Sequence, residues 1–136
     1  MSDMAQLITA IPKAELHVHI EGTIEADLLL TIADRNGIAL PYKSAADILA
    51  GQNKGKSDPK QNLDSFIEAL DVCRSVLRRG RDYEDIIYGY LKRCQIEKIV
   101  YAEFMFDPQQ GIRQGVGIEA QLEALISGSL AGAREF

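Results

Sequence analysis

Apolar and polar positions alternate along the chain with two different periods, which together predict an α/β protein. Residues 14–20 alternate apolar and polar side chains, and residues 99–106 form a nearly continuous, β-rich apolar run. Both patterns predict strands, and Asp107-Pro108 stops the second. The segment between them repeats apolar residues at helical spacing, and a further helical pattern follows. Strand, helices, strand and helix is the order expected of a parallel α/β unit.

The helices are predicted from apolar residues recurring every three or four positions. Thr23 is the expected cap of the first helix, Asn62 is a plausible cap of a later one, and Gly80 marks a joint between two helices. A short helix is expected over residues 44–50, and a weaker one over 118–133, diluted by Gly128 and Gly132. The main apolar stripes are Leu28, Leu29, Ile32 and Ala33; Leu63, Phe66, Ile67, Leu70, Cys73 and Leu77; and Tyr83, Ile86, Ile87, Tyr90, Leu91 and Cys94.

Residues 51–62 are rich in turn formers and lysine and predict a loop. This loop could be a solvated surface connection or a lid over an active site, and the sequence leaves both interpretations open. The strand at 99–106 is apolar almost throughout, which predicts burial on both faces. Glu103 within it then needs a polar interior partner, either as part of the core or near a functional site. Cys73 and Cys94 are expected to be buried and unpaired.

The only two histidines, His17 and His19, lie one residue apart in the first predicted strand. Side chains alternate between the faces of a strand, so His17, His19 and Glu21 would share one side. Leu16, Val18 and Ile20 would share the other. Two adjacent imidazoles at a strand end would make half of a catalytic metal site, and the alternative is that they simply line the solvated face.

Residues 11–23, with the sequence Ile-Pro-Lys-Ala-Glu-Leu-His-Val-His-Ile-Glu-Gly-Thr, resemble the first strand of the adenosine/adenine deaminase family. Residues 28–42, 63–67 and 101–109 are similar to later parts of the family pattern, whereas 51–62 cannot be placed on it. The family consists of zinc-dependent purine aminohydrolases built on a (β/α)8 barrel.

The fold implied by this resemblance is the N-terminal portion of a (β/α)8 barrel. Such a barrel takes about 250 residues, so the 136 residues of this chain are too few to close one. We therefore expect a single incomplete domain over residues 1–136, belonging to a longer enzyme.

The resemblance also implies roles for individual residues. His17 and His19 would hold Zn²⁺, and Glu21 would contact the substrate. Leu63, Phe66 and Ile67 match the apolar gate over the purine, although core packing explains their spacing equally well. The family's catalytic groups and remaining ligands would lie beyond Phe136, and the chain contains no third histidine. The 136-residue chain alone is therefore expected to be inactive.

The predicted function is that of a zinc-dependent purine deaminase that removes the 6-amino group of adenine or adenosine by hydrolysis. Adenine is favoured because Glu21 and the Asp107-Pro108-Gln109 segment are typical of the adenine deaminase branch. The alternative is a non-catalytic truncated homologue that acts as a structural or binding module.

The composition of the chain limits the classes of molecule that it is expected to bind. The net charge of −5 disfavours nucleic acid and anionic membranes, and no run of about 18–20 apolar residues is present to span a bilayer. We expect a soluble cytoplasmic protein whose partner is a small-molecule purine. Unpaired strand edges would make the isolated chain self-associate.

Overall fold

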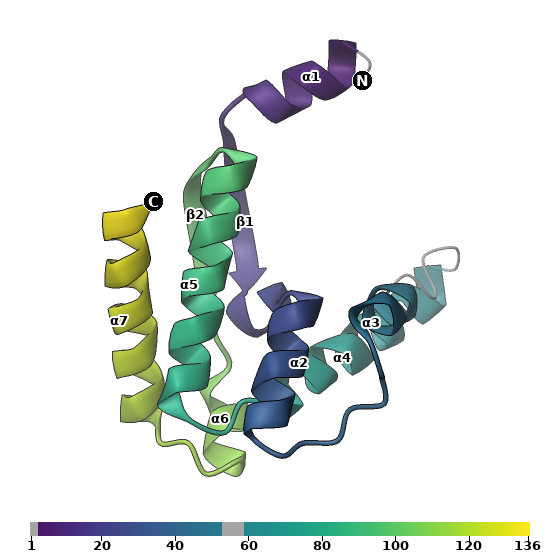
Figure 1. Cartoon of the computed structure of the whole chain (residues 1–136), viewed down its shortest axis with the longest axis vertical. Coiled ribbons are helices and arrows are strands. Elements are labelled where there is room, and N and C mark those ends of the chain that lie inside the picture. Colours follow the sequence, from purple (N-terminus) through teal and green to yellow (C-terminus); the bar gives the residue numbers. More distant parts are fainter. Residues whose placement is uncertain (1–2, 53–58) are drawn as a thin grey trace.

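The computed structural model describes residues 3–52 and 59–136 and shows a parallel α/β arrangement. Its two strands are neighbours in one sheet, and the chain between them is helical (Figure 1). The elements are α1 (Asp3–Ala10), β1 (Lys13–His19), the 3₁₀ helix η1 (Ile20–Thr23), α2 (Ala26–Arg35), α3 (Ala45–Gln52), α4 (Pro59–Ser75), α5 (Gly80–Glu97), β2 (Ile99–Met105), α6 (Pro108–Arg113) and α7 (Ile118–Glu135). The predicted strands and main helices are confirmed, whereas α1 and α6 were not predicted.

The parallel pairing of β1 and β2 brings their carboxyl ends to one edge of the sheet. Val18 pairs with Phe104 and His19 pairs with Met105. The register shifts between Glu15 and Val18, so β1 contains an irregularity at its centre. The segments that follow the two strands, η1 and the start of α6, consequently leave the sheet side by side.

The core lies between the sheet, η1 and the helices α2 and α5. Its helical members recur every three or four positions, as the apolar stripes of the sequence predicted. Their burial provides the main stabilisation of the fold. The fully buried apolar side chains include Ile20, Leu29, Ile32, Ile48, Val76, Leu77, Tyr83, Ile86, Ile87 and Tyr90. Cys73 and Cys94 are buried free thiols, as expected.

Asp82, in the first turn of α5, is a buried hydrogen-bond acceptor that ties α2 to α5. It accepts hydrogen bonds from the backbone N–H groups of Arg78 and Arg79, at 2.8 and 2.9 Å, and from Asn36 Nδ2 at 2.7 Å. Arg35 forms an ion pair with the same carboxylate. A buried charge is tolerated only when it is paired and hydrogen-bonded, and Asp82 meets both conditions.

Helices α5 and α7 run side by side (Figure 1) and approach closely at two glycines of α7. A Cβ atom at Gly128 would lie 2.4 Å from Ile87 Cγ2, and one at Gly132 would lie 2.6 Å from Leu91 Cδ1. Gly128 and Gly132, which weaken the helical pattern of the sequence, thus allow the helix–helix contact.

Several predicted boundaries are wrong in detail. Helix α2 begins at Ala26, with Glu25 as its N-cap, while the hydroxyl of Thr23 donates to Ile20 O within η1. The turn of η1 separates Thr23 from the helix that it was expected to cap.

The predicted 51–62 loop is helical at both ends in the described part of the chain. Helix α3 reaches Gln52 and α4 starts at Pro59, so Asn62 is not a cap. The remainder of the predicted loop, 53–58, lies outside the described residues.

The prediction that β2 is buried on both faces is also wrong. Val100, Tyr101 and Phe104 are exposed, and so is Glu103, which accepts a hydrogen bond from the hydroxyl of Tyr101 at 2.6 Å. The physical reason is that β1 is the only strand paired with β2 among the described residues. Leu16 on β1 is exposed as well, contrary to the expected alternation.

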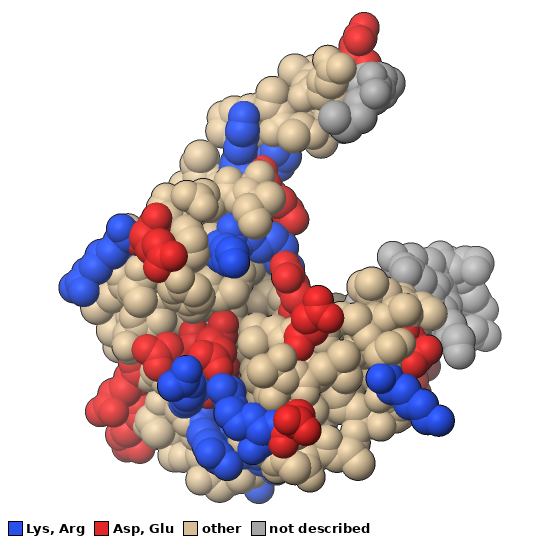
Figure 2. Space-filling view, viewed as in Figure 1, with Lys and Arg blue, Asp and Glu red and all other residues tan. Residues whose placement is uncertain are grey.

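Acidic and basic side chains lie next to one another over α2 and α5 on the face shown in Figure 2. Arg35 pairs with Asp85 at 2.7 Å, and Arg93 lies 3.9 Å from Glu97.

No helix in the described part of the chain combines the length and apolar character that crossing a bilayer requires.

Candidate active site

His17 and His19 lie at the carboxyl end of β1 with their imidazole rings side by side. The ring centroids are 5.5 Å apart, and the ring planes meet at 68°. His17 is exposed and His19 is half-buried. The predicted juxtaposition of the two imidazoles is therefore present, at the edge of the sheet where parallel α/β folds place their ligands.

The backbone at His17 adopts a left-handed conformation, with φ at 61°. This conformation costs a non-glycine residue about 1–2 kcal/mol. It coincides with the register shift between Glu15 and Val18, so strand pairing on either side holds it in place. Simple strand alternation consequently does not explain how the two rings come together.

Glu21 is buried in η1 and presents one unpaired oxygen. Its side chain is 1% exposed, and its Oε1 accepts a hydrogen bond from the backbone N–H of Asp107 at 2.6 Å. Its Oε2 is buried and has no hydrogen-bond partner among the described residues. Because β1 ends at His19, the expectation that Glu21 continues the same strand face is wrong; η1 determines its position instead.

Two side chains near Glu21, those of Arg74 and Tyr83, were not identified as site residues from the sequence. Arg74 on α4 lies 3.2 Å from Asp107, which follows β2. Burial, together with the negative charges of Glu21, Asp82 and Asp107, raises the pKa of Tyr83 to about 12. No sequence signal separated Arg74 from the other arginines nearby, because its role depends on a contact with a residue 33 positions later.

Leu63, Phe66 and Ile67 lie on α4 and are 63%, 53% and 44% exposed. Core packing within this chain therefore does not explain their spacing. Leu70 continues the same helical stripe, and a Cβ atom at Gly22 would lie 3.3 Å from its Cδ1. The apolar stripe thus extends from η1, where Glu21 lies, onto an exposed part of α4. A role of the three residues as a gate stays a prediction.

The donor set at this edge suits half of a zinc site. Neutral imidazole nitrogens are common zinc ligands, and a catalytic site normally has three protein ligands and a water molecule. No group of three or more His, Cys, Asp or Glu side chains is arranged to hold a metal ion in the described residues. His17 and His19 could therefore supply two ligands but not a complete site.

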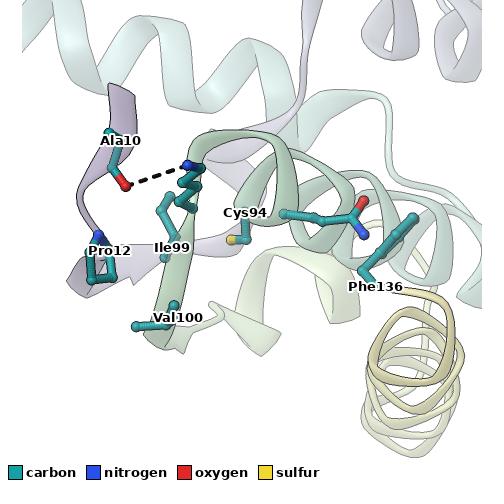
Figure 3. A pocket seen from close by; sticks show the side chains of 8 residues that line it. Ala10, Pro12, Cys94, Ile99, Val100 and Phe136 are labelled. Carbon is teal, nitrogen blue, oxygen red and sulfur yellow. Dashed lines mark hydrogen bonds between the residues drawn. The ribbon is translucent and has the colours of Figure 1, made fainter. Parts of the chain in front are cut away.

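A separate cavity of about 570 Å³ lies at the opposite, amino end of the two strands (Figure 3). Pro12 precedes β1 there, and Lys98, which precedes β2, donates through Nζ to Ala10 O at 3.4 Å. Cys94 and Phe136 line the same cavity. It is distant along both strands from His19, so it is not part of the candidate site.

Known proteins share the sequence pattern of this chain, including the segment that carries His17 and His19. The family described as adenosine deaminase matches residues 12–136. An adenine deaminase from Acinetobacter baylyi is 41% identical over 123 residues, which are 90% of this chain and 35% of that protein. The chain thus spans about a third of the length of this relative.

Solved structures share the fold. The crystal structure of an adenine deaminase from Arthrobacter aurescens matches with a TM-score of 0.80 and 31% identity, covering 93% of this chain and 37% of that one. An amidohydrolase from Burkholderia ambifaria, with bound Zn, matches with a TM-score of 0.79 and 24% identity over 100% of this chain and 36% of that one. The second likeness shows the fold alone.

The α/β arrangement and the unclosed sheet correspond to the N-terminal portion of a (β/α)8 barrel, as predicted. The family match extends over nearly the whole chain and includes both strands and the His17–His19 pair. The chain belongs to the adenosine deaminase family.

Proposed function

We propose that this chain forms the N-terminal part of a zinc-dependent purine deaminase that hydrolyses the 6-amino group of adenine, with adenosine as the less favoured substrate. In the overall reaction water adds at C6 and ammonia leaves. The observation that supports this most directly is the pair of imidazoles, His17 and His19, followed two residues later by the buried carboxylate of Glu21. The adenine deaminase that is 41% identical supports the reaction class.

The two histidines are proposed as zinc ligands because they offer adjacent nitrogen donors at the edge of the sheet. The chemistry that bound zinc supplies is Lewis-acid activation of water near neutral pH. The chain's own contribution is to hold both rings on one strand, with the other ligands and the acid–base groups coming from sequence outside these 136 residues.

Glu21 is proposed as the residue that distinguishes a free base from a nucleoside. Its unpaired Oε2 can accept a hydrogen bond from the imidazole N–H of adenine, whereas adenosine carries ribose at that nitrogen and would leave the buried carboxylate unpaired. A site built to pair with a substrate donor rejects an analogue without it by about 10⁴-fold or more. We therefore propose adenine as the preferred substrate.

Leu63, Phe66 and Ile67 are proposed to cover the purine. They form an exposed apolar stripe continuous with Leu70, which contacts the η1 turn at Gly22. The face of a purine ring placed over Glu21 would shield part of this stripe from water, and burial of the apolar side chains is favourable at about 25 cal/mol per Å².

The test uses His17→Ala and His19→Ala in the complete polypeptide that contains this chain. Each variant should lose zinc and adenine deamination together, by more than about 100-fold, since loss even of residues that only support metal ligands costs 10–100-fold. Zinc is measured by atomic absorption and turnover by ammonia release. Arg81→Met, a change at an exposed surface arginine, is the matched control.

Full zinc content and a near-normal rate in either histidine variant would contradict the ligand assignment. Absence of adenine and adenosine deamination in the unaltered, zinc-loaded polypeptide would instead favour the non-catalytic module. The ratio of kcat/KM for adenine to that for adenosine tests the role of Glu21, and Glu21→Asp should reduce this ratio.

A further inference from the structure

A continuous chain of polar contacts connects helix α4 to Glu21 through the segment after β2. The guanidinium Nη2 of Arg74 lies 3.2 Å from Asp107 Oδ2, and the backbone N–H of Asp107 donates to Glu21 Oε1 at 2.6 Å. These three residues come from α4, the end of β2 and η1. The orientation of Glu21 therefore depends on the position of Asp107, which is paired in turn with Arg74.

The side chain of Asp107 does not have the role that its place in the sequence predicts. Asp107 is the N-cap of α6, with Pro108 at the first helical position. An aspartate there usually accepts a hydrogen bond from a backbone amide of the helix, which stabilises it by about 1 kcal/mol. Asp107 makes no such side-chain cap bond and pairs with Arg74 instead. Helix capping consequently does not account for this contact.

Stability alone does not account for Arg74 either. Its side chain is only 14% exposed, so most of it has been removed from water. Its Nε is buried with no hydrogen-bond partner among the described residues. The Asp107 side of the ion pair is 37% exposed, and ion pairs in contact with water contribute only about 0–1 kcal/mol to stability. The presence of a charged residue here points to a functional requirement.

We propose that Arg74 is a positioning residue for purine recognition. Through Asp107 it fixes the amide that holds Glu21 Oε1, and Oε2 is thereby directed to the purine N–H. This inference rests on the proposed function of the site. It predicts that Arg74 affects how tightly the free base binds, while the two histidines and their metal are left unchanged.

The experiment compares Arg74→Met, Arg74→Lys and Asp107→Asn in the complete zinc-loaded polypeptide. Asp107→Asn keeps the backbone N–H that bonds Glu21 and removes only the carboxylate charge. The matched control is Asp71→Asn, which removes the other, exposed carboxylate near Arg74, at 3.7 Å. Zinc content, kcat and KM for adenine are measured. Calorimetry gives the Kd of hypoxanthine, which has the same imidazole N–H and is not deaminated.

Arg74→Met should raise the KM of adenine and the Kd of hypoxanthine about tenfold, the size of effect expected when a hydrogen bond to a charged group is lost. Zinc content should be unchanged, and kcat should change less than KM. Arg74→Lys should restore part of the affinity because it keeps the charge. Asp107→Asn should resemble Arg74→Met, and the double variant should be no worse than either, because both act through one contact.

Three results would overturn the inference, and they are distinguishable. If the unaltered polypeptide neither deaminates adenine nor binds hypoxanthine, the proposed function fails and the role of Arg74 fails with it. If it does both and Arg74→Met has unchanged KM and Kd, only the positioning role fails. If zinc content or cooperative unfolding falls in parallel with affinity in all three variants, Arg74 is a structural residue only.

Discussion

Two glycines in the middle of long helices should respond in opposite ways to the same substitution. Gly89 on α5 and Gly128 on α7 are both helical, so alanine at either position gains about 1 kcal/mol of intrinsic helix propensity. A Cβ atom at Gly89 would meet only Leu28 Cδ2, at 3.4 Å. At Gly128 it would lie 2.4 Å from Ile87 Cγ2 and 2.8 Å from the backbone oxygen of Glu84.

The contact distances determine the sign of each effect. Carbon atoms pack at about 3.5–4.0 Å, so Gly89→Ala fits with little adjustment and should stabilise the protein by about 0.5–1 kcal/mol. Gly128→Ala must displace α7 from α5, because the carbonyl of Glu84 belongs to a helix backbone and cannot rotate away. Overpacking of this kind costs about 1–3 kcal/mol. We expect a net destabilisation of up to about 2 kcal/mol after the propensity gain.

The assay is urea unfolding followed by far-ultraviolet circular dichroism, with both variants and the unaltered protein in the same polypeptide. The midpoint should rise for Gly89→Ala and fall for Gly128→Ala, with unchanged slope, since a changed slope would indicate an altered unfolded state. Equal stability of the two variants, or an increase for Gly128→Ala, would refute the claim that Gly128 is required for the close contact of α5 and α7.

Two further predictions concern the buried polar groups. Asp82→Ala should lower the free energy of unfolding by about 3–5 kcal/mol, because the backbone N–H groups of Arg78 and Arg79 lose their acceptor at about 1–3 kcal/mol each. Arg35 keeps Asp85 and Asn36 keeps the Val76 carbonyl as remaining acceptors. Urea unfolding measures the change, and a loss under about 1 kcal/mol would contradict the prediction. Burial raises the pKa of Tyr83 from 10.0 to about 12 and that of Cys73 from 9.0 to about 11. Both groups are neutral when protonated, so their unfolded forms lose protons first. The stability that Tyr83 contributes is complete below pH 10 and is lost as the pH rises through 12. Stability measured over this range should therefore fall less steeply for Tyr83→Phe, and an identical pH profile would contradict the prediction.

The elements with strong periodicity were predictable from the sequence, and so was the proximity of His17 and His19. The left-handed backbone at His17 and the register shift beside it, which together bring the rings to this arrangement, were not predictable from the sequence. The contact between Glu21 and Asp107 was not predictable, because it joins a side chain to a backbone amide 86 positions away. The exposure of β2 was also missed, since an apolar run indicates what a strand can bury and not how many neighbours it has.

The glycines of α7 show a different limit of sequence reasoning. Helix propensity treats Gly128 and Gly132 as weak points, and within an isolated helix they are. Their value appears only when α5 lies against them, at distances that exclude a methyl group. Local patterns therefore predicted that the helix exists but not why its least favourable residues are present.

Position 17 combines a left-handed backbone, which is unfavourable for histidine, with a side chain that is proposed to bind zinc. Glycine or asparagine would relax this conformation, so a screen that rewards thermal stability alone would be drawn to replace the histidine. If His17 binds zinc as proposed, a screen for deamination by the complete polypeptide would retain it. In directed evolution of this protein, selection for thermal stability and selection for deamination should therefore favour different residues at position 17.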